Sequence, residues 1–315
     1  MEFSHVPVLL NEVLEGLNVR ENGIYVDGTL GGAGHGREIA ARLGAGGIFV
    51  GIDRDRDALD ASRSRLADLP CRVELVQSNY SQIKLVMSEL GLPGLDGALL
   101  DLGVSSFQLD NPERGFSYMH DAPLDMRMNA DDSLTAEDVV NGYPKEELAR
   151  IIRDYGEERW AGRIADFIVR ARAEKRLTST FELVDVIKAA VPASARRDGP
   201  HPAKRTFQAL RIEVNDELGQ LRTAVDDFID CLAPGGRLAI ISFHSLEDRI
   251  VKESFQKRLN PCVCPPDLPV CVCGRKPDIK KVTRKPVTAS AAELGANPRA
   301  RSAKLRVIEK LERES

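Results

Sequence analysis

The sequence predicts an α/β protein with a mostly parallel, doubly wound sheet that is interrupted by an all-helical insertion. Short apolar, β-branched runs alternate with helical patterns up to residue 101, which is typical of successive βαβ units. From 111 to 202 strand-like runs are absent, and they return at 236–243. The 315 residues suffice for one large domain or two ordinary ones.

The first third of the chain contains four expected strands. Each is a short buried-type run, and strands one, two and four end in an aspartate: we expect strands over 24–27, 47–53, 73–77 and 95–101. The intervening segments have helical patterns, over 37–43, 57–66 and 83–90. Right-handed crossovers would make these strands parallel.

The middle of the chain contains only helical patterns, over 135–140, 145–155, 157–174 and 180–191. The last has a helix start at Ser179 or Thr180 with a glutamate, Glu182, following. A helix over 206–231, a turn at 233–236, a strand over 236–243 and a strand over 304–309 then complete the expected elements. We therefore assign residues 1–111 and 204–315 to a discontinuous α/β domain and residues 112–203 to an inserted helical domain.

Composition excludes several classes of protein. Apolar residues make up 43% and charged residues 29%, as in ordinary globular proteins, so disorder is not expected for most of the chain. No apolar run approaches the roughly 18 residues of a membrane span. The N-terminus begins Met-Glu-Phe-Ser-His, without the basic and apolar regions of a secretory signal. A cytoplasmic location is expected.

The net charge of −4 is unevenly distributed. Residues 274–310 hold eleven Lys or Arg against three acids, a local charge of +8, so the rest of the chain carries −12. Because a phosphate-binding surface is a local patch, the overall acidity does not exclude a nucleic-acid partner. A solvated basic surface without a partner is the other interpretation.

A glycine-rich loop over 28–36 follows the first expected strand. Glycines there allow the backbone to approach a ligand at the carboxyl edge of the sheet. The dinucleotide fingerprint is excluded, because Arg37 or Ile39 stands where its third glycine would be needed.

The loop instead has the pattern Gly32-x-Gly34-x-Gly36, with Asp27 ending the first strand and Asp53 ending the second. It is similar to the S-adenosylmethionine loop of class I methyltransferases. A carboxylate such as that of Asp53 offers two acceptor oxygens to the vicinal hydroxyls of a ribose. A purely structural turn is the alternative.

Longer motifs extend the resemblance over about residues 5–310. They are His5–Leu10, Asp101–Asp110, Glu113–Ser117, Pro123–Met128, His201–Ile212, Ser242–Arg249 and Asn297–Ser302. With the glycine loop, these segments closely resemble the bacterial ribosomal RNA small-subunit methyltransferase H family, also called MraW.

The resemblance implies a class I methyltransferase, a Rossmann-like fold, with S-adenosylmethionine as cofactor and methyl donor. It implies methylation of the exocyclic N4 of one cytidine in the decoding region of small-subunit (16S) ribosomal RNA, with the helical insertion serving RNA recognition. The substrate is free RNA or an assembled ribosomal subunit, and a homodimer is compatible with the family. A methyltransferase for another RNA or for DNA, or an RNA scaffold without turnover, are the alternatives.

The family's cofactor contacts carry over onto seven positions, which are Ala33, Gly34, His35, Asp53, Tyr80, Asp101 and Gln108. Tyr80 stands where family members often have Phe, and the aromatic face is retained. Taken alone, Tyr80 is also compatible with ordinary core packing.

Asp101 is the expected catalytic residue. The exocyclic amine of cytosine is a poor nucleophile because its lone pair is delocalised, so an acceptor for its protons would assist methyl transfer. Other amino-methyltransferases have Asp-Pro-Pro-Tyr where this chain has Asp101-Leu102-Gly103-Val104. Backbone carbonyls or the hydroxyls of Ser105 and Ser106 are therefore further candidates. The target base must leave its stack or lie in a single strand.

Two histidines and two basic blocks complete the candidates. His120 and His244 are interpreted as structural, because transfer from a sulfonium needs no strong base. The blocks 204–211 and 275–306 are the expected phosphate contacts.

Four of the six cysteines are clustered, as Cys262-x-Cys264 and Cys271-x-Cys273. Disulfides are disfavoured in the cytoplasm, so a structural zinc site with four thiolate ligands is one interpretation. Free thiols in a surface loop are the other. The family resemblance does not require these cysteines, and Cys71 and Cys231 are expected to be isolated thiols.

Overall fold

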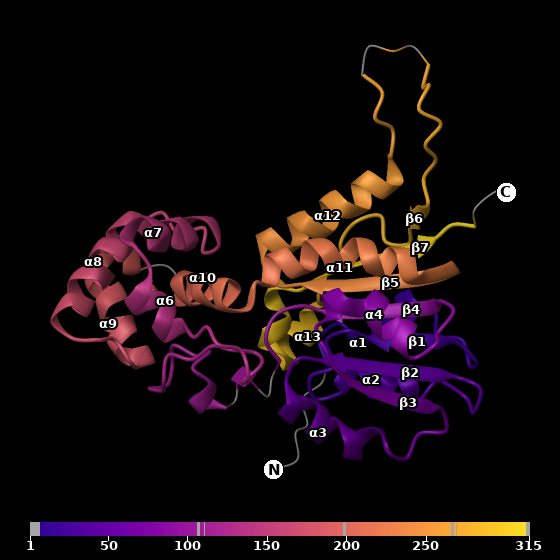
Figure 1. Cartoon of the computed structure of the whole chain (residues 1–315), viewed down its shortest axis with the longest axis horizontal. Coiled ribbons are helices and arrows are strands. Elements are labelled where there is room, and N and C mark those ends of the chain that lie inside the picture. Colours follow the sequence, from indigo (N-terminus) through magenta and orange to yellow (C-terminus); the bar gives the residue numbers. More distant parts are fainter. Residues whose placement is uncertain are drawn as a thin grey trace. The chain divides into compact units, whose positions relative to one another are not determined.

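The computed structural model describes residues 7–105, 108–109, 111–197, 200–265, 268 and 270–312. The chain divides into two compact units (Figure 1). The α/β unit comprises residues 1–103 and 218–315, and the helical unit comprises residues 104–217. Among the described helices none has the length and apolar character needed to cross a membrane.

The α/β unit contains a seven-stranded sheet in the order β3-β2-β1-β4-β5-β7-β6. Neighbouring strands from β3 to β5 are parallel, and β7 is antiparallel to both β5 and β6. This confirms the predicted mostly parallel, Rossmann-like sheet. The strands are β1 (Ile24–Asp27), β2 (Ile48–Asp53), β3 (Arg72–Gln77), β4 (Leu95–Asp101), β5 (Leu232–Ser242), β6 (Ile279–Lys281) and β7 (Lys304–Lys310).

The central strands β1, β2 and β4 are buried on both faces, and successive side chains of a strand point to opposite faces. On one face Tyr25, Phe49 and Leu99 share a core with α1 and α2. On the other, Leu100 and Phe228 of α11 both approach the first residue after β1. The helices of this unit are α1 (Leu10–Leu17), α2 (Gly34–Ala40), α3 (Arg56–Leu66), α4 (Ile83–Glu89), α11 (Glu217–Cys231), α12 (Ser245–Leu259) and α13 (Ala291–Ala296).

The expected turn at 233–236 lies inside β5. Leu232 pairs with Leu95 of β4, whereas Arg237 pairs with Gly97, so four residues of β5 loop out between these two pairs. A Cβ on Gly236 would lie 2.4 Å from the Leu95 carbonyl oxygen. Glycine is therefore required at this turn.

The helical unit has its own apolar core, built from side chains such as Val139, Ile151, Ile164 and Ile187. Thr135 and Ser179 begin their helices with capping boxes, each accepting from a backbone N–H three residues later. The helices are α6 (Ala136–Gly142), α7 (Lys145–Asp154), α8 (Ala161–Glu174), α9 (Thr180–Ala190) and α10 (Lys204–Asn215).

The expected helix over 206–231 is wrong as a single helix. It breaks at Asp216, whose φ of 47° is left-handed. Asn215 fixes the end of α10, since its side chain donates to the Met126 carbonyl and accepts from the Met128 N–H, both at 2.8 Å. Phe207 and Leu210 of α10 lie in the helical core. The helical unit therefore extends to residue 217, and it begins at residue 104, whereas the sequence suggested 112–203.

Candidate active site

Three carboxylates lie at the carboxyl ends of adjacent parallel strands. Asp27 ends β1, Asp53 ends β2 and Asp101 ends β4, and β1 pairs with both other strands. Burial and the charge of Asp53 raise the pKa of Asp27 to about 7, and burial raises the pKa of Asp53 to about 6. Burial, with the charges of Asp27 and Glu247, raises the pKa of Asp101 well above its usual range. Such a cluster favours a cationic ligand.

Asp53 anchors the glycine-rich loop. Its Oδ2 accepts from the Gly31 N–H at 2.7 Å, and its Oδ1 accepts from the Asp55 N–H at 2.9 Å. Each carboxylate oxygen has a second lone pair, so Asp53 can hold the loop and still accept from a ligand hydroxyl.

Thr29 links the Asp27 carboxylate to the backbone of Asp101 and was not among the residues predicted from the sequence. Its Oγ1 accepts from the Asp101 N–H at 2.6 Å and lies 3.4 Å from Asp27 Oδ1. The Thr29 N–H also donates to Asp27 Oδ1, at 3.1 Å. An aspartate followed two residues later by a threonine is a turn signal that could have identified this link.

The glycines of the loop have different roles. A Cβ on Gly34 would lie 2.8 Å from Pro7 Cγ, and one on Gly36 would lie 2.8 Å from Phe49 Cζ. These two glycines therefore permit close packing within the protein. Gly32 meets only Arg65 Nη1, at 3.4 Å. Ala33 has a left-handed φ of 57° at the start of α2, a conformation that is strained for a residue with a Cβ.

His35 and Asp101, two of the predicted site residues, lie together. His35 Nδ1 is 3.5 Å from Asp101 Oδ2, and its Nε2 is 2.9 Å from the Val8 carbonyl oxygen. Burial lowers the pKa of His35 to about 4, so the ring is neutral. Asp101 Oδ1 is buried and has no hydrogen-bond partner within the described part of the chain. An orphaned carboxylate oxygen at a strand end is a candidate contact for a ligand donor.

Tyr80 begins a short 3₁₀ segment, Tyr80–Gln82, directly after β3. A Cβ on Gly28 would lie 3.2 Å from Tyr80 Cβ and 2.6 Å from Leu100 Cδ2. Gly28 is the first residue after β1, so Tyr80 lies over the same strand edge as the carboxylates.

Gln108 belongs to the helical unit. It is buried, and its side-chain Oε1 accepts from the Ser105 N–H at 3.1 Å. Its backbone N–H donates to Ser105 Oγ at 3.2 Å. The Ser105 hydroxyl thus caps a turn. Ser106 lies outside the described residues, and His120 is exposed in the helical unit.

Glu247 is the principal residue that sequence reasoning missed. It is buried, and its Oε2 accepts from the N–H groups of Phe243 and His244, at 2.8 and 3.2 Å. His244 Nδ1 accepts in turn from the Glu247 N–H at 3.4 Å, which completes a capping box on α12. His244 therefore has the structural role that the sequence suggested, and a cap residue followed three positions later by Glu was the available signal.

The two basic blocks are partly neutralised inside the protein. Arg211 pairs with Glu217 at 2.8 Å, and Lys304 and Arg306 both pair with Asp248. The exposed cations of the C-terminal block for which the described part of the chain provides no ion pair are Arg275, Lys281, Arg284, Lys285 and Arg301.

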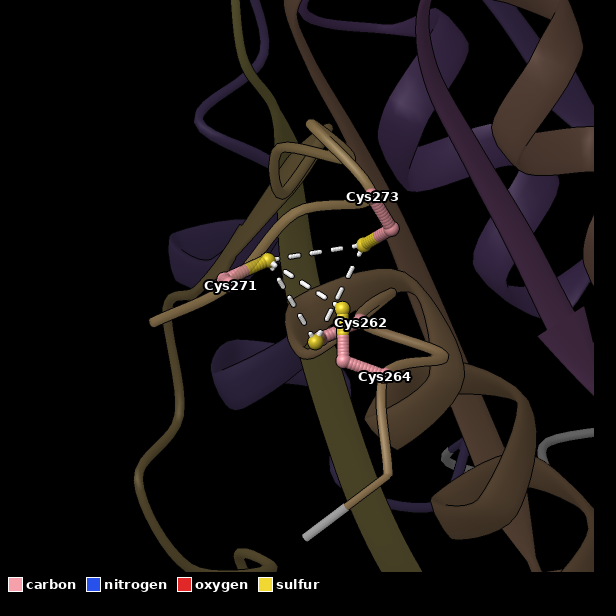
Figure 2. Close-up of side chains that lie close together, drawn as sticks. All are labelled: Cys262, Cys264, Cys271 and Cys273. Atoms are coloured by element: carbon pink, nitrogen blue, oxygen red, sulfur yellow. Dashed lines mark hydrogen bonds between the residues drawn. The ribbon is translucent and has the colours of Figure 1, made fainter. Parts of the chain in front are cut away.

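The sulfur atoms of the four clustered cysteines all lie within 4.8 Å of one another (Figure 2). Cys71 is buried and Cys231 half-buried. The metal-ligand set anticipated from the spacing is thus brought into one place.

Comparison with known proteins identifies relatives over the whole chain. The model of the MraW methylase family matches residues 2–311. Three proteins named ribosomal RNA small subunit methyltransferase H are similar. That of Ruminiclostridium cellulolyticum is 57% identical over 99% of this chain and 100% of its own. That of Symbiobacterium thermophilum is 57% identical over 99% and 98%, and that of Heliobacterium modesticaldum is 58% identical over 99% and 100%.

Proposed function

Because this chain belongs to the MraW methylase family, we propose that it methylates the exocyclic N4 of a cytidine in the decoding region of small-subunit (16S) ribosomal RNA. S-adenosylmethionine is the proposed donor. The observation that carries the proposal is the buried Oδ1 of Asp101 at the end of β4, for which the described residues provide no hydrogen-bond partner. The relatives' names support ribosomal RNA as the substrate, and such a substrate would place the enzyme in the cytoplasm.

The residues at the strand edge fit this cofactor. S-adenosylmethionine supplies a methyl group on a positively charged sulfonium centre. Asp27, Asp53 and Asp101 have raised pKa values because burial disfavours their charged forms, and a nearby cation would offset that cost. Asp53 would accept from the ribose hydroxyls, and the face of Tyr80 would line the adenine.

The loop residues Ala33, Gly34 and His35 would complete the cofactor contacts. The left-handed Ala33 and the close packing of Gly34 against Pro7 constrain this part of the backbone, which would lower the cost of ordering it when a ligand binds. The family resemblance also assigns Gln108 to the cofactor, and that assignment remains a prediction.

Asp101 would act on the target amine. Its carboxylate can accept an N–H from the cytosine amine, which directs the nitrogen lone pair toward the methyl group. When N4 gains the methyl group it must release one proton. The positive sulfonium would favour the charged form of Asp101, and a carboxylate whose pKa is raised by burial accepts such a proton more readily than an exposed one. His35, neutral and held by Val8, positions the carboxyl group.

The helical unit has a feature that suits RNA. Arg159 lies over the Trp160 ring at 5.2 Å, and Arg163 lies over the Phe167 ring at 5.4 Å. Both arginines are exposed. Arg159 lies just before α8, and Arg163 lies in its first turn. Arginines held on aromatic rings can contact phosphates and stack on bases. We therefore propose that the helical unit recognises the RNA.

The experiment is methyl transfer by the purified chain from S-adenosylmethionine to 16S ribosomal RNA, offered both as free RNA and as small subunits from cells that lack the enzyme. Digestion to nucleosides and mass spectrometry should reveal N4-methylcytidine. A methyl group on ring N3 or C5 of cytidine would contradict the proposal. Equal transfer to an unrelated RNA or to DNA would assign a different substrate, and cofactor binding without transfer to any of them would favour the scaffold.

A further inference from the structure

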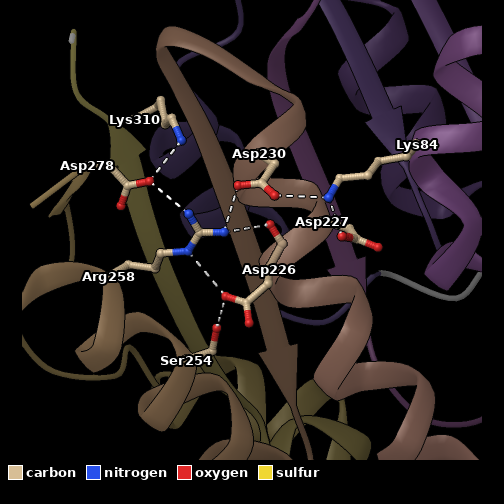
Figure 3. A network of polar contacts seen from close by, with 8 residues as sticks. All are labelled: Lys84, Asp226, Asp227, Asp230, Ser254, Arg258, Asp278 and Lys310. Carbon is tan, nitrogen blue, oxygen red and sulfur yellow. Dashed lines mark hydrogen bonds and ion pairs between the residues drawn. The ribbon is translucent and has the colours of Figure 1, made fainter. Parts of the chain in front are cut away.

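The cysteine cluster lies in a long segment that joins α12 to β6 and extends away from the sheet (Figure 1). Ion pairs hold the two arms together at the base. Arg258, in the last turn of α12, pairs with Asp278, just before β6, at 2.9 Å. Lys310 pairs with the same oxygen of Asp278 at 3.1 Å, and Arg258 also pairs with Asp230 of α11 at 2.7 Å (Figure 3).

Farther from the sheet, the described valines of the segment are not packed in a core. Val263, Val270 and Val272 are 63%, 70% and 76% exposed. Small segments without a core usually need a covalent or metal cross-link to hold one conformation. The four cysteines are placed where such a link would act, with Cys262 and Cys264 on the arm that leaves α12 and Cys271 and Cys273 on the returning arm (Figure 2).

The distances between the sulfur atoms match a four-coordinate metal site. Cys271 Sγ lies 3.5 Å from both Cys262 Sγ and Cys273 Sγ, and 3.8 Å from Cys264 Sγ. Cys273 Sγ lies 3.8 Å from Cys262 Sγ. Four sulfurs arranged tetrahedrally at the usual zinc–sulfur distance of about 2.3 Å are separated by about 3.8 Å. A disulfide would require about 2.05 Å.

Backbone N–H groups also surround the sulfur atoms. The Val272 N–H donates to Cys264 Sγ at 3.4 Å, and the backbone N–H groups of Val263 and Arg275 interact with Cys273. Such donors stabilise sulfur in its thiolate form, which is the form that binds metals. Arg275 and Lys276 follow on the returning arm and add positive charge.

We propose that Cys262, Cys264, Cys271 and Cys273 together bind one Zn²⁺ ion through four thiolates, and that this ion closes the outer part of the segment. Four thiols become thiolates, so binding releases four protons to solvent and leaves a zinc–thiolate group of charge −2. The neighbouring N–H groups and cations offset this charge. With no open coordination position, the ion is structural. The proposal does not depend on the methyltransferase assignment.

The test is the metal content of the full-length chain, purified under reducing conditions without chelators and measured by inductively coupled plasma mass spectrometry. We expect one zinc per chain, and loss of nearly all of it in Cys262→Ser and in Cys271→Ser. The matched controls are Cys71→Ser and Cys231→Ser, which change thiols outside the cluster and should retain one zinc. Substitution by Co²⁺ should give the intense absorption bands of a tetrahedral thiolate site, and these should be absent from the Cys271→Ser variant.

Amide hydrogen exchange reports on the cross-link independently of the metal assay. Removing zinc with a chelator should accelerate exchange in 262–273 while β4 and β5 keep their protection. The proposal is overturned if the native chain contains two disulfides in place of zinc or if iron occupies the site. It is also overturned if the Cys262→Ser and Cys271→Ser variants bind as much zinc as the controls.

Discussion

The Nδ1 atom of His35 lies 3.5 Å from Oδ2 of Asp101, while the other ring nitrogen lies 2.9 Å from the Val8 carbonyl oxygen. A carbonyl oxygen only accepts, so Nε2 carries the hydrogen and Nδ1 presents a lone pair to Asp101. A protonated carboxyl group suits that arrangement, in agreement with the raised pKa of Asp101. The pair is therefore neutral before a cationic ligand arrives. A bound sulfonium would favour loss of the carboxyl proton, and the resulting carboxylate could then accept a proton from the amine.

Asp27→Asn should stabilise the protein at neutral pH. The folded pKa of Asp27 is about 7 and its ordinary value is 3.8, because burial disfavours the charge. Between these two values the folded state keeps a proton that the unfolded state releases, so native stability falls as pH rises. The gain from Asp27→Asn should therefore grow from near zero at about pH 4 to about 4 kcal/mol at about pH 7, then stay constant.

Chemical denaturation across this pH range measures the effect of Asp27→Asn. The control is Asp60→Asn, which alters an aspartate with 61% side-chain exposure on α3 and should give no pH-dependent difference. If Asp27→Asn increases the stability equally at the low and high ends of this pH range, burial of the Asp27 charge is not the cause.

Asp53→Ala should weaken binding of S-adenosylmethionine by about 10- to 100-fold, because hydrogen bonds from the ribose to a charged acceptor are lost. Asp53→Asn keeps one acceptor oxygen and can still hold the loop, so its affinity for S-adenosylmethionine should lie between those of the native chain and Asp53→Ala. Isothermal titration calorimetry gives the affinities, with Asp60→Ala as the control. Native affinity in Asp53→Ala would refute the ribose contact.

Replacing Arg159 and Arg163 by Glu should weaken RNA binding without changing the affinity for S-adenosylmethionine. If both arginines contact phosphates, the plot of log affinity against log salt concentration should become less steep, by about one unit of slope for each arginine. Fluorescence anisotropy with labelled RNA at several salt concentrations measures this slope. Arg170→Glu is the control, since Arg170 lies on α8 and already pairs with Asp166 at 2.7 Å. An equal effect in the control would point to net charge alone.

Asp216→Gly should stabilise the protein by about 0.5–1 kcal/mol, because glycine adopts the left-handed conformation between α10 and α11 without a steric penalty. Asp216→Ala removes the same charge but keeps a Cβ, so it should give no gain. Thermal denaturation of both variants separates the two effects. A gain of the same size in Asp216→Ala would trace the effect to charge and not to the backbone.

The sequence predicted six of the seven strands, because each is a run of apolar residues bounded by turn residues. It missed β6, whose three residues, Ile279–Lys281, contain a single apolar side chain that is recognised only in its pairing with β7. It also extended one helix through Asp216, where no glycine or proline marks the break. That break follows from contacts of Asn215 with residues almost ninety positions away, which local patterns do not reveal.

The site could be predicted where motifs mark it and not where contacts build it. Asp27, Asp53 and Asp101 each end an apolar run, so their places at one sheet edge followed from the expected topology. The links through Thr29 and the charge of Glu247 depend on distances between separate elements. The glycines were interpreted as room for a ligand, yet Gly34 and Gly36 face Pro7 and Phe49.

The central claim is that the carboxyl group of Asp101 assists methyl transfer to a cytidine N4. Its most direct test compares the native chain with Asp101→Asn by nucleoside mass spectrometry of 16S ribosomal RNA. In cells that lack this gene, we predict that the native chain restores N4-methylcytidine. With purified proteins, we predict that Asp101→Asn transfers the methyl group about 100-fold more slowly than the native chain. No N4-methylcytidine with the native chain, or full activity in Asp101→Asn, would contradict the account.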